Sequence, residues 1–311
     1  MAVTIVPITS STQWLEMRKP NVGCSEVAAL FGIHEYLTGF ALAARKLGKL
    51  PDTVDSAVLK RGRLLEPVAR QLLAEERQEW QQIAATDYYC DRDIRFGATP
   101  DLFVKDDRGR KGLIQIKTVA PTIFQRKWHN PHTGEIEPPL WIALQAMCEM
   151  HLTSADFAVV AALVVDDWAL TLETVDVPFL PGLVEEARRK VEAFWVMVDK
   201  GELPAPDYGK DAGNLSKVYA LAEPDSEIDL TADNELPELV DQVEALRMAK
   251  NTAETAMKEA QAKILYKLGD HERGRFAGGL VVAKTVSVKE HMVKGSQYRR
   301  MSFKLDRERA A

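Results

Sequence analysis

The sequence predicts a mixed α/β fold, a mixed sheet flanked by helices, with a helical and β-hairpin extension after it. Extended runs that are rich in β-branched, aromatic or other apolar residues recur at residues 87–93, 102–104, 113–117, 155–165 and 168–175. Segments with helical apolar spacing surround them, at residues 11–19, 38–47, 56–79, 122–128, 140–152 and 180–200. With 46% hydrophobic and 28% charged residues, the composition is that of an ordinary globular protein.

Composition changes after residue 200. Residues 201–237 are rich in Pro, Gly, Asp and Ser, residues 238–268 are Ala-, Glu- and Lys-rich with helical spacing, and the segments GLVVAKTVSV and YRRMSFKL flank a basic loop at 291–297. We expect an α/β core at residues 1–205, a linker or loosely packed segment at 206–237, and a helical plus hairpin extension at 238–311. The basic tail either contacts DNA or a partner, or is a solvated edge.

Charge and composition exclude several classes of protein. The net charge of -6 argues against coating of nucleic acid over the whole surface, but it permits a local basic channel. No apolar run is long enough to span a membrane, and the N-terminus lacks a secretory pattern, so we expect a cytoplasmic protein. The three cysteines and six histidines are scattered, which predicts reduced core thiols and no zinc site.

Residues 99–117 (TPDLFVKDDRGRKGLIQIK) carry the main candidate site. Two extended runs flank a polar, Gly-containing turn, which predicts a hairpin with Asp101 at its start. Because side chains alternate along a strand, Gln115 and Lys117 share one face while Ile114 and Ile116 share the other. A surface hairpin with polar residues on its solvent side is the alternative interpretation.

Oxygen ligands for a metal ion accompany this hairpin. Asp101 and Glu66 supply carboxylates, the Ile116 carbonyl and the Gln115 amide supply further oxygens, and Lys117 supplies a cation, as metal-assisted phosphodiester hydrolysis requires. Gln145, on an apolar helix, is a candidate for positioning a ligand or the scissile phosphate. Glu66 alone fits either an exposed helix position or an inward ligand, beside a Pro67 that is expected to kink or restart its helix.

An anion site is a second candidate. Ser25 is a natural N-cap for a helix over residues 26–31, and Arg18 ends the preceding helix. A capped helix with a nearby Arg can bind phosphate, although a capped helix beside a surface Arg is an equal alternative.

In this order, RKPNVGCS (18–25), RGRLLE (61–66), TPD (99–101), IQIK (114–117) and Gln145 resemble the lambda exonuclease and YqaJ-type phage recombinase nucleases. These enzymes are a branch of the PD-(D/E)XK superfamily, whose core is restriction-endonuclease-like. The resemblance covers about the first 200 residues. It implies Mg²⁺-dependent 5′→3′ digestion of one strand of linear duplex DNA, which generates 3′ overhangs for phage-type recombination by single-strand annealing.

The resemblance also implies a role for each matching residue. Glu66, Asp101 and Gln115, with the Ile116 carbonyl, fall on metal-ligand positions for two Mg²⁺ ions, for which Mn²⁺ is an alternative. Lys117 is the catalytic lysine and Gln145 the active-site glutamine. The residues expected to contact DNA or its 5′-phosphate are Arg18, Ser25, Arg61, Arg63 and Thr118. The implied partners are DNA ends, a single-strand annealing protein and further copies of the chain in a trimeric ring, and no membrane. The resemblance also implies a phage or prophage gene and a location in the bacterial host cytoplasm.

One position departs from this pattern, because the family usually has Glu where this chain has Gln115. A unit charge pair at ~4 Å and an effective dielectric constant of ~20 is worth about 4 kcal/mol, so the change is large enough to reduce activity strongly. Two interpretations follow: an active exonuclease that coordinates through the Gln oxygen, or a DNA-end-binding recombination protein with weakened or absent nuclease activity. An α/β protein with no DNA affinity is a third.

Overall fold

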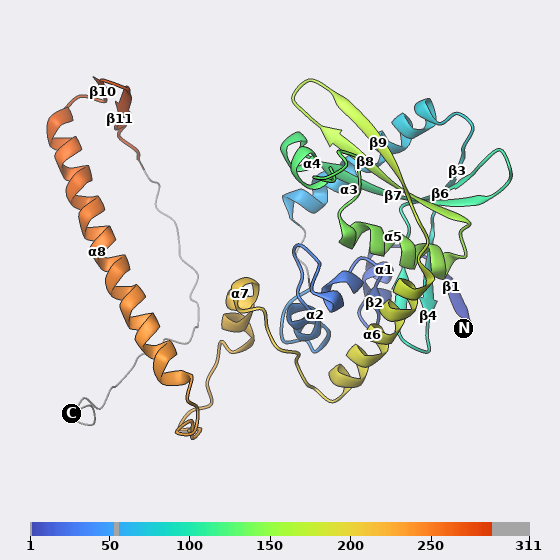
Figure 1. Ribbon diagram of the computed structural model, residues 1–311, viewed down its shortest axis with the longest axis horizontal. Helices are drawn as coiled ribbons and strands as arrows, with labels where there is room; N and C mark the ends of the chain where they lie inside the picture. Colours follow the sequence, from blue (N-terminus) through green and yellow to red (C-terminus); the bar gives the residue numbers. More distant parts are fainter. Residues whose placement is uncertain (1, 53–55, 288–311) are drawn as a thin grey trace. The chain divides into compact units, whose positions relative to one another are not determined.

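The computed structural model describes residues 2–52 and 56–287, which belong to two compact units, residues 1–218 and 219–311 (Figure 1). The division follows helix α7 (Tyr208–Val218), which lies inside the segment expected to be a linker. The three-part domain division remains a prediction.

A mixed five-stranded sheet, in the order β3-β6-β7-β8-β9, forms the centre of the first unit. Strands β7 and β8 are parallel and the other neighbours are antiparallel. The chain passes from β7 to β8 through helices α4 and α5, as a parallel pair requires. The strands are β3 (Gln81–Ala84), β6 (Leu102–Lys105), β7 (Lys111–Val119), β8 (Phe157–Val165) and β9 (Leu170–Val177), and the helices are α4 (Pro121–Lys127) and α5 (Leu140–Thr153).

Apolar side chains cover both faces of this sheet. Ile114 and Ile116 pack with Ala69 and Leu73 of helix α3 (Ala57–Glu76) in one cluster, while Leu113 belongs to the larger core that α5 shares. Figure 1 shows α3 and α5 on either side of the central strands. The mixed α/β fold that the sequence predicts, a mixed sheet flanked by helices, is therefore confirmed.

The larger core extends to a four-stranded sheet in the order β1-β4-β5-β2. Three of its strands, β1, β2 and β5, were not predicted, because runs of two to five residues carry little periodicity. The strands are β1 (Val3–Pro7), β2 (Val22–Gly23), β4 (Asp87–Asp91) and β5 (Phe96–Ala98), and the surrounding helices are α1 (Ser11–Arg18), α2 (Gly39–Lys46) and α6 (Pro181–Asp199), with the 3-10 helix η1 (Val27–Phe31).

Helix α5 is the most buried helix of this unit. Every residue from Ile142 to Met150 is buried, including Gln145 and Glu149. An α-helix that is covered on all sides belongs to the interior of a domain, where a polar side chain needs a partner. The three cysteines are also buried and free, as expected.

One local prediction about a helix terminus was wrong. Ser25 does not cap a helix: η1 follows Glu26, and the Ser25 hydroxyl instead accepts a hydrogen bond from Arg18 at 3.2 Å. Of the two outcomes expected at Pro67, a kink or a restart, the restart is not observed, because helix α3 continues through this residue. Proline removes one N–H donor, and a 20-residue helix held by its Leu73 and Ala69 contacts tolerates that loss.

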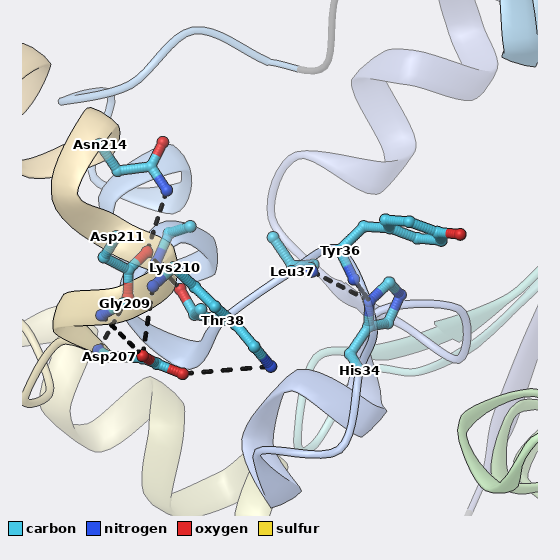
Figure 2. Close-up of polar contacts among 10 residues, drawn as sticks. His34, Tyr36, Leu37, Thr38, Asp207, Gly209, Lys210, Asp211 and Asn214 are labelled. Atoms are coloured by element: carbon cyan, nitrogen blue, oxygen red, sulfur yellow. Dashed lines mark hydrogen bonds and ion pairs between the residues drawn. The ribbon is translucent and has the colours of Figure 1, made fainter. Parts of the chain in front are cut away.

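Helix α7 attaches to the first unit through a buried carboxylate (Figure 2). Asp211 is 0% exposed and accepts hydrogen bonds from Thr38 Oγ1 at 2.7 Å and Asn214 Nδ2 at 2.9 Å. Thr38 Oγ1 also accepts from the Ala41 N–H at 2.9 Å, so it caps α2 and holds α7 at once. The Pro- and Gly-rich composition of this segment concealed the helix.

The second unit contains one long helix, α8 (Leu236–Leu268), followed by an antiparallel hairpin of β10 (Arg273–Phe276) and β11 (Gly279–Val282). The sequence left a long helix or a helical hairpin open, and the single helix is observed. Strand β11 lies in the predicted run GLVVAKTVSV, but it pairs with residues 273–276. The predicted strand YRRMSFKL and the basic loop 291–297 lie outside the described residues.

In the part of the chain that the structure describes, no helix is both long enough and apolar enough to cross a membrane.

Replacing Asp211 with Ala is expected to lower the free energy of unfolding by about 1–3 kcal/mol, because the Thr38 hydroxyl loses a charged acceptor. Urea unfolding followed by circular dichroism measures this difference. Lys210→Ala, on the same helix, is the control and should stay within about 0.5 kcal/mol of the unchanged protein. Equal stability of Asp211→Ala and the unchanged protein would show that α7 attaches by other contacts.

Candidate active site

The site lies where strand β6 begins. Strands β6 and β7 pair from Lys105↔Lys111 to Leu102↔Ile114, and Asp101 comes immediately before β6. The Ile116 N–H lies beyond the last paired residue of β7 and donates to Asp101 Oδ2 at 2.8 Å. A carboxylate therefore continues the ladder in place of a main-chain carbonyl. Because the N–H and C=O of one strand residue face the same neighbour, the Ile116 carbonyl is directed to this edge as well.

Gln115 and Lys117 lie on the face of β7 that helix α5 covers, opposite to the face that carries Ile114 and Ile116. Gln115 is only 2% exposed, and Lys117 is partly buried. Both faces of β7 are covered, so the alternative of a surface hairpin with solvent-side polar residues is wrong.

A chain of hydrogen bonds links these side chains to α5. Lys117 Nζ donates to Gln145 Oε1 at 3.1 Å, and Gln145 Nε2 donates to Gln115 Oε1 at 3.0 Å. Gln115 Nε2 in turn donates to Asp101 Oδ2. Gln145 Nε2 also donates to Glu149 Oε1 at 2.8 Å, one helical turn away. The site thus brings together Asp101, Gln115, Lys117 and Gln145 as predicted, and it includes Glu149, which the sequence analysis did not single out.

Glu66 reaches the site through Arg70. The two residues form an i,i+4 ion pair on α3, and the Arg70 guanidinium also donates to the Asp101 main-chain carbonyl. The Glu66 side chain is 31% exposed, so it is neither fully outward nor buried. Arg70 is a further member that the sequence analysis missed, and its position four residues after Glu66 is the signal for it.

The electrostatics of Asp101 favour a cation. Burial raises the pKa of Asp101 to about 6, the Lys117 ammonium lowers it, and the Glu66 carboxylate raises it further. Two carboxylates that repel each other beside a main-chain carbonyl are hard oxygen donors of the kind that Mg²⁺ binds. Glu66, Asp101 and the Ile116 carbonyl therefore supply donors of the type that a divalent cation binds, and their role as ligands remains a prediction.

Gln115 fits that role less directly, because its oxygen faces Gln145 and its nitrogen faces Asp101. Among residues 2–52 and 56–287, no three His, Cys, Asp or Glu side chains gather as a metal-binding group. The amide at position 115 stands where a third carboxylate would complete such a group, so its ligand role remains a prediction.

The candidate anion site lies around Arg18. Its guanidinium donates to Ser25 Oγ, lies 3.9 Å from Glu26 Oε1 and stacks over the Trp14 ring at 4.6 Å. Lys46 Nζ approaches Glu26 Oε2 at 3.3 Å. Two cations thus share one carboxylate, which leaves positive charge for an anion, but η1 is a single short turn and adds no helix terminus to the site.

The remaining predicted DNA contacts flank the active site. A Cβ atom built on Gly62 would lie 4.0 Å from Thr118 Oγ1, so α3 approaches the residue that follows Lys117. Arg61 and Arg63 are the neighbours of Gly62; Arg61 is partly buried and Arg63 exposed. Lys117 Nζ also lies 5.9 Å from the Trp141 ring centroid, and Trp141 contacts His34 at 4.7 Å between ring centroids.

His34 fixes the loop beside Trp141. Its Nδ1 accepts the N–H groups of Tyr36 at 3.1 Å and Leu37 at 3.0 Å (Figure 2). The tautomer with the proton on Nε2 is therefore required. A pocket of about 440 Å³ lies further along this segment, bordered by η1, α6 and the residues before α7, and none of the predicted site residues lines it.

Glu149 makes the free energy of unfolding of the protein depend on pH. It is 1% exposed, and burial raises its pKa from 4.5 to about 8, with the Asp101 charge adding to the effect. Between these values the folded protein holds a proton that the unfolded chain releases, so stability falls as pH rises.

We expect Glu149→Gln to be more stable than the unchanged protein near pH 8, by on the order of a few kcal/mol, and the difference to shrink toward pH 4.5. Urea unfolding in EDTA across this range measures it. A difference that does not vary with pH would contradict the assignment.

The chain is similar to a known protein family and to several solved structures. Residues 13–156 match the family model of the YqaJ-like viral recombinase domain, while no curated protein matches the chain. The structure is similar to an alkaline exonuclease (LHK-Exo) from Laribacter hongkongensis, at 22% identity over 66% of this chain and 100% of that chain, with a TM-score of 0.48. It is also similar to a phage related exonuclease from Haemophilus somnus 129PT, at 15% identity over 58% of this chain and 94% of that chain, with a TM-score of 0.42.

A putative exonuclease from Eubacterium rectale is similar at 13% identity over 72% of this chain and 98% of that chain, with a TM-score of 0.44. The matched residues include every predicted site residue, from Arg18 to Gln145. The chain is therefore similar to the YqaJ-like viral recombinase family over residues 13–156.

Proposed function

We propose that this protein is a Mg²⁺-dependent exonuclease that digests one strand of linear duplex DNA from its 5′ end and leaves 3′ single-stranded overhangs. The observation that carries the proposal is the position of Lys117: Gln145 holds its ammonium beside the Asp101 carboxylate, at the edge where β6 begins. The family similarity of the segment that contains these residues supports it.

Each side chain has a distinct task in this proposal. Glu66, Asp101, the Ile116 carbonyl and, after rotation of its amide, Gln115 would hold Mg²⁺, with two ions expected and Mn²⁺ as a substitute. An ion held there would polarise the scissile phosphate and lower the pKa of a water nucleophile. Lys117 orients that water or stabilises charge on the phosphate, and Gln145 fixes Lys117.

The remaining proposed contacts select the DNA end. Arg18 and Ser25 bind the 5′-phosphate, and Arg61, Arg63 and Thr118 contact the DNA backbone. The overhang would pass to a single-strand annealing protein in phage-type recombination. We also propose a trimeric ring around DNA and action in the host cytoplasm, from a phage or prophage gene. These parts of the proposal rest on the resemblance described above.

A second candidate function follows from Gln115. Its amide nitrogen, rather than an oxygen, faces Asp101, which favours a DNA-end-binding recombination protein with weak or absent cleavage. This candidate predicts salt-sensitive binding to duplex ends without release of nucleotides.

The direct test is incubation of the protein with 5′-phosphorylated linear duplex and Mg²⁺. We expect release of nucleotides from 5′ ends, and Lys117→Ala is expected to lower the rate about 10²–10⁴-fold, as the loss of a positioned proton-transfer or charge-stabilising group does. Lys105→Ala, on an exposed position of neighbouring strand β6, is the control and should leave the rate unchanged. Acid-soluble nucleotide release and gel analysis of end-labelled strands measure rate and polarity.

Gln115→Glu separates the two candidate functions. If the unchanged protein binds DNA ends without cutting and Gln115→Glu cuts, the end-binding function is correct and the missing charge explains it. If neither protein releases nucleotides, the exonuclease proposal fails.

Arg18→Ala is expected to remove the preference for 5′-phosphorylated over 5′-hydroxyl ends, since the guanidinium supplies the charge that distinguishes them. The ratio of kcat/KM for the two substrates measures this preference. Lys19→Ala is the matched control, because Lys19 is an adjacent cation that pairs with Glu16 at 2.6 Å. Equal loss with both variants would assign the effect to general charge rather than to Arg18.

A further inference from the structure

Glu149 is a buried carboxylate that the proposed function does not use. Its Oε1 accepts from Gln145 Nε2 at 2.8 Å, while its Oε2 is buried and has no hydrogen-bond partner in the described structure. An unsatisfied oxygen on a buried acid costs free energy. The surrounding positions of α5 are apolar, so the packing of this helix does not require an acid at residue 149.

The direction of the hydrogen-bond chain gives Glu149 a task. Lys117 can only donate, so the Gln145 oxygen must face it and the Gln145 nitrogen must face away. Glu149 Oε1 receives that nitrogen. Without an acceptor at this point, the Gln145 amide could turn and present its nitrogen to the Lys117 ammonium.

The same chain determines the direction of Gln115. Gln145 Nε2 donates to Gln115 Oε1, so the Gln115 nitrogen is left to face Asp101. Gln115 therefore directs no oxygen at Asp101. Gln145 Nε2 has two acceptors, Gln115 Oε1 on β7 and Glu149 Oε1 one helical turn away on α5.

We propose that Glu149 is a positioning residue: its carboxyl oxygen accepts from Gln145 Nε2 and so orients Gln145 with its own oxygen toward Lys117. The inference rests on the proposed nuclease function. It assigns Glu149 no direct contact with DNA or with a metal ion.

Two variants test this proposal. Glu149→Gln keeps an acceptor oxygen for Gln145, whereas Glu149→Met removes it. The kcat and KM for DNA ends are measured for each variant, together with thermal unfolding in EDTA.

We expect Glu149→Met to lose at least about tenfold in kcat with KM unchanged, because Gln145 Nε2 keeps only one of its two acceptors, Gln115 Oε1. Glu149→Gln should stay within about threefold of the unchanged protein in kcat, since its amide oxygen still accepts from Gln145. Asp211→Asn, which alters another buried carboxylate of this unit, should leave kcat unchanged.

Distinct results overturn each proposal. If the unchanged protein does not cut DNA, the proposed function fails. If it does, and Glu149→Met equals it in kcat, the inference fails. The inference also fails if Glu149→Met loses activity only in proportion to lost stability, or if Glu149→Gln loses as much kcat as Glu149→Met.

Discussion

The site depends on the hydrogen bond from the Ile116 N–H to the Asp101 carboxylate, where the β6–β7 ladder ends. A strand that continued its pairing would fill this edge with main-chain groups. Because a side chain takes the place of the next rung, the Asp101 carboxylate is held at this edge, to which the Ile116 carbonyl is also directed. Strand pairing thus positions both residues, while Glu66 and Lys117 reach the site through longer side chains.

Helix α5 provides the second constraint. Because residues 142–150 of this helix are all buried, Gln145 and Glu149 have few rotamers available, and both polar atoms of Gln145 find their partners within the core. The fixed side chain of Gln145 in turn fixes Lys117, because the Gln145 amide oxygen accepts a hydrogen bond from its ammonium group. A flexible ammonium on a four-carbon stem acquires a defined position without an ion pair of its own.

The sequence allowed prediction of the elements with strong periodicity or clear turns. The hairpin around Asp106 and Gly109, the helices α5 and α6 and strands β8 and β9 were all expected, and Asp101, Gln115, Lys117 and Gln145 do meet. Short strands such as β2 lacked a pattern. Helix α7 was missed because its Gly-containing sequence resembles a linker, and only the tertiary contact of Asp211 with Thr38 identifies it.

Glu149 could not be recognised from spacing alone. An acid in an apolar helix faces solvent in most proteins, and only the packing of both sheets around α5 shows that this one does not. The prediction for Ser25 was also wrong, because this residue, although suited to capping a helix, accepts a hydrogen bond from Arg18 instead. In both cases local preference was overridden by contacts between residues distant in the chain or in adjacent elements.

The amide on β7 and the carboxylate on α5 also constrain how this chain can evolve. A mutation that places Glu at position 115 while Glu149 is present puts two buried acids on one glutamine, so its effect depends on the residue at 149. Substitutions at the two positions are then epistatic, and their order matters. Relatives with Glu at 115 are expected to carry a neutral residue at the position of Glu149, a covariation that sequence alignments of the family can reveal.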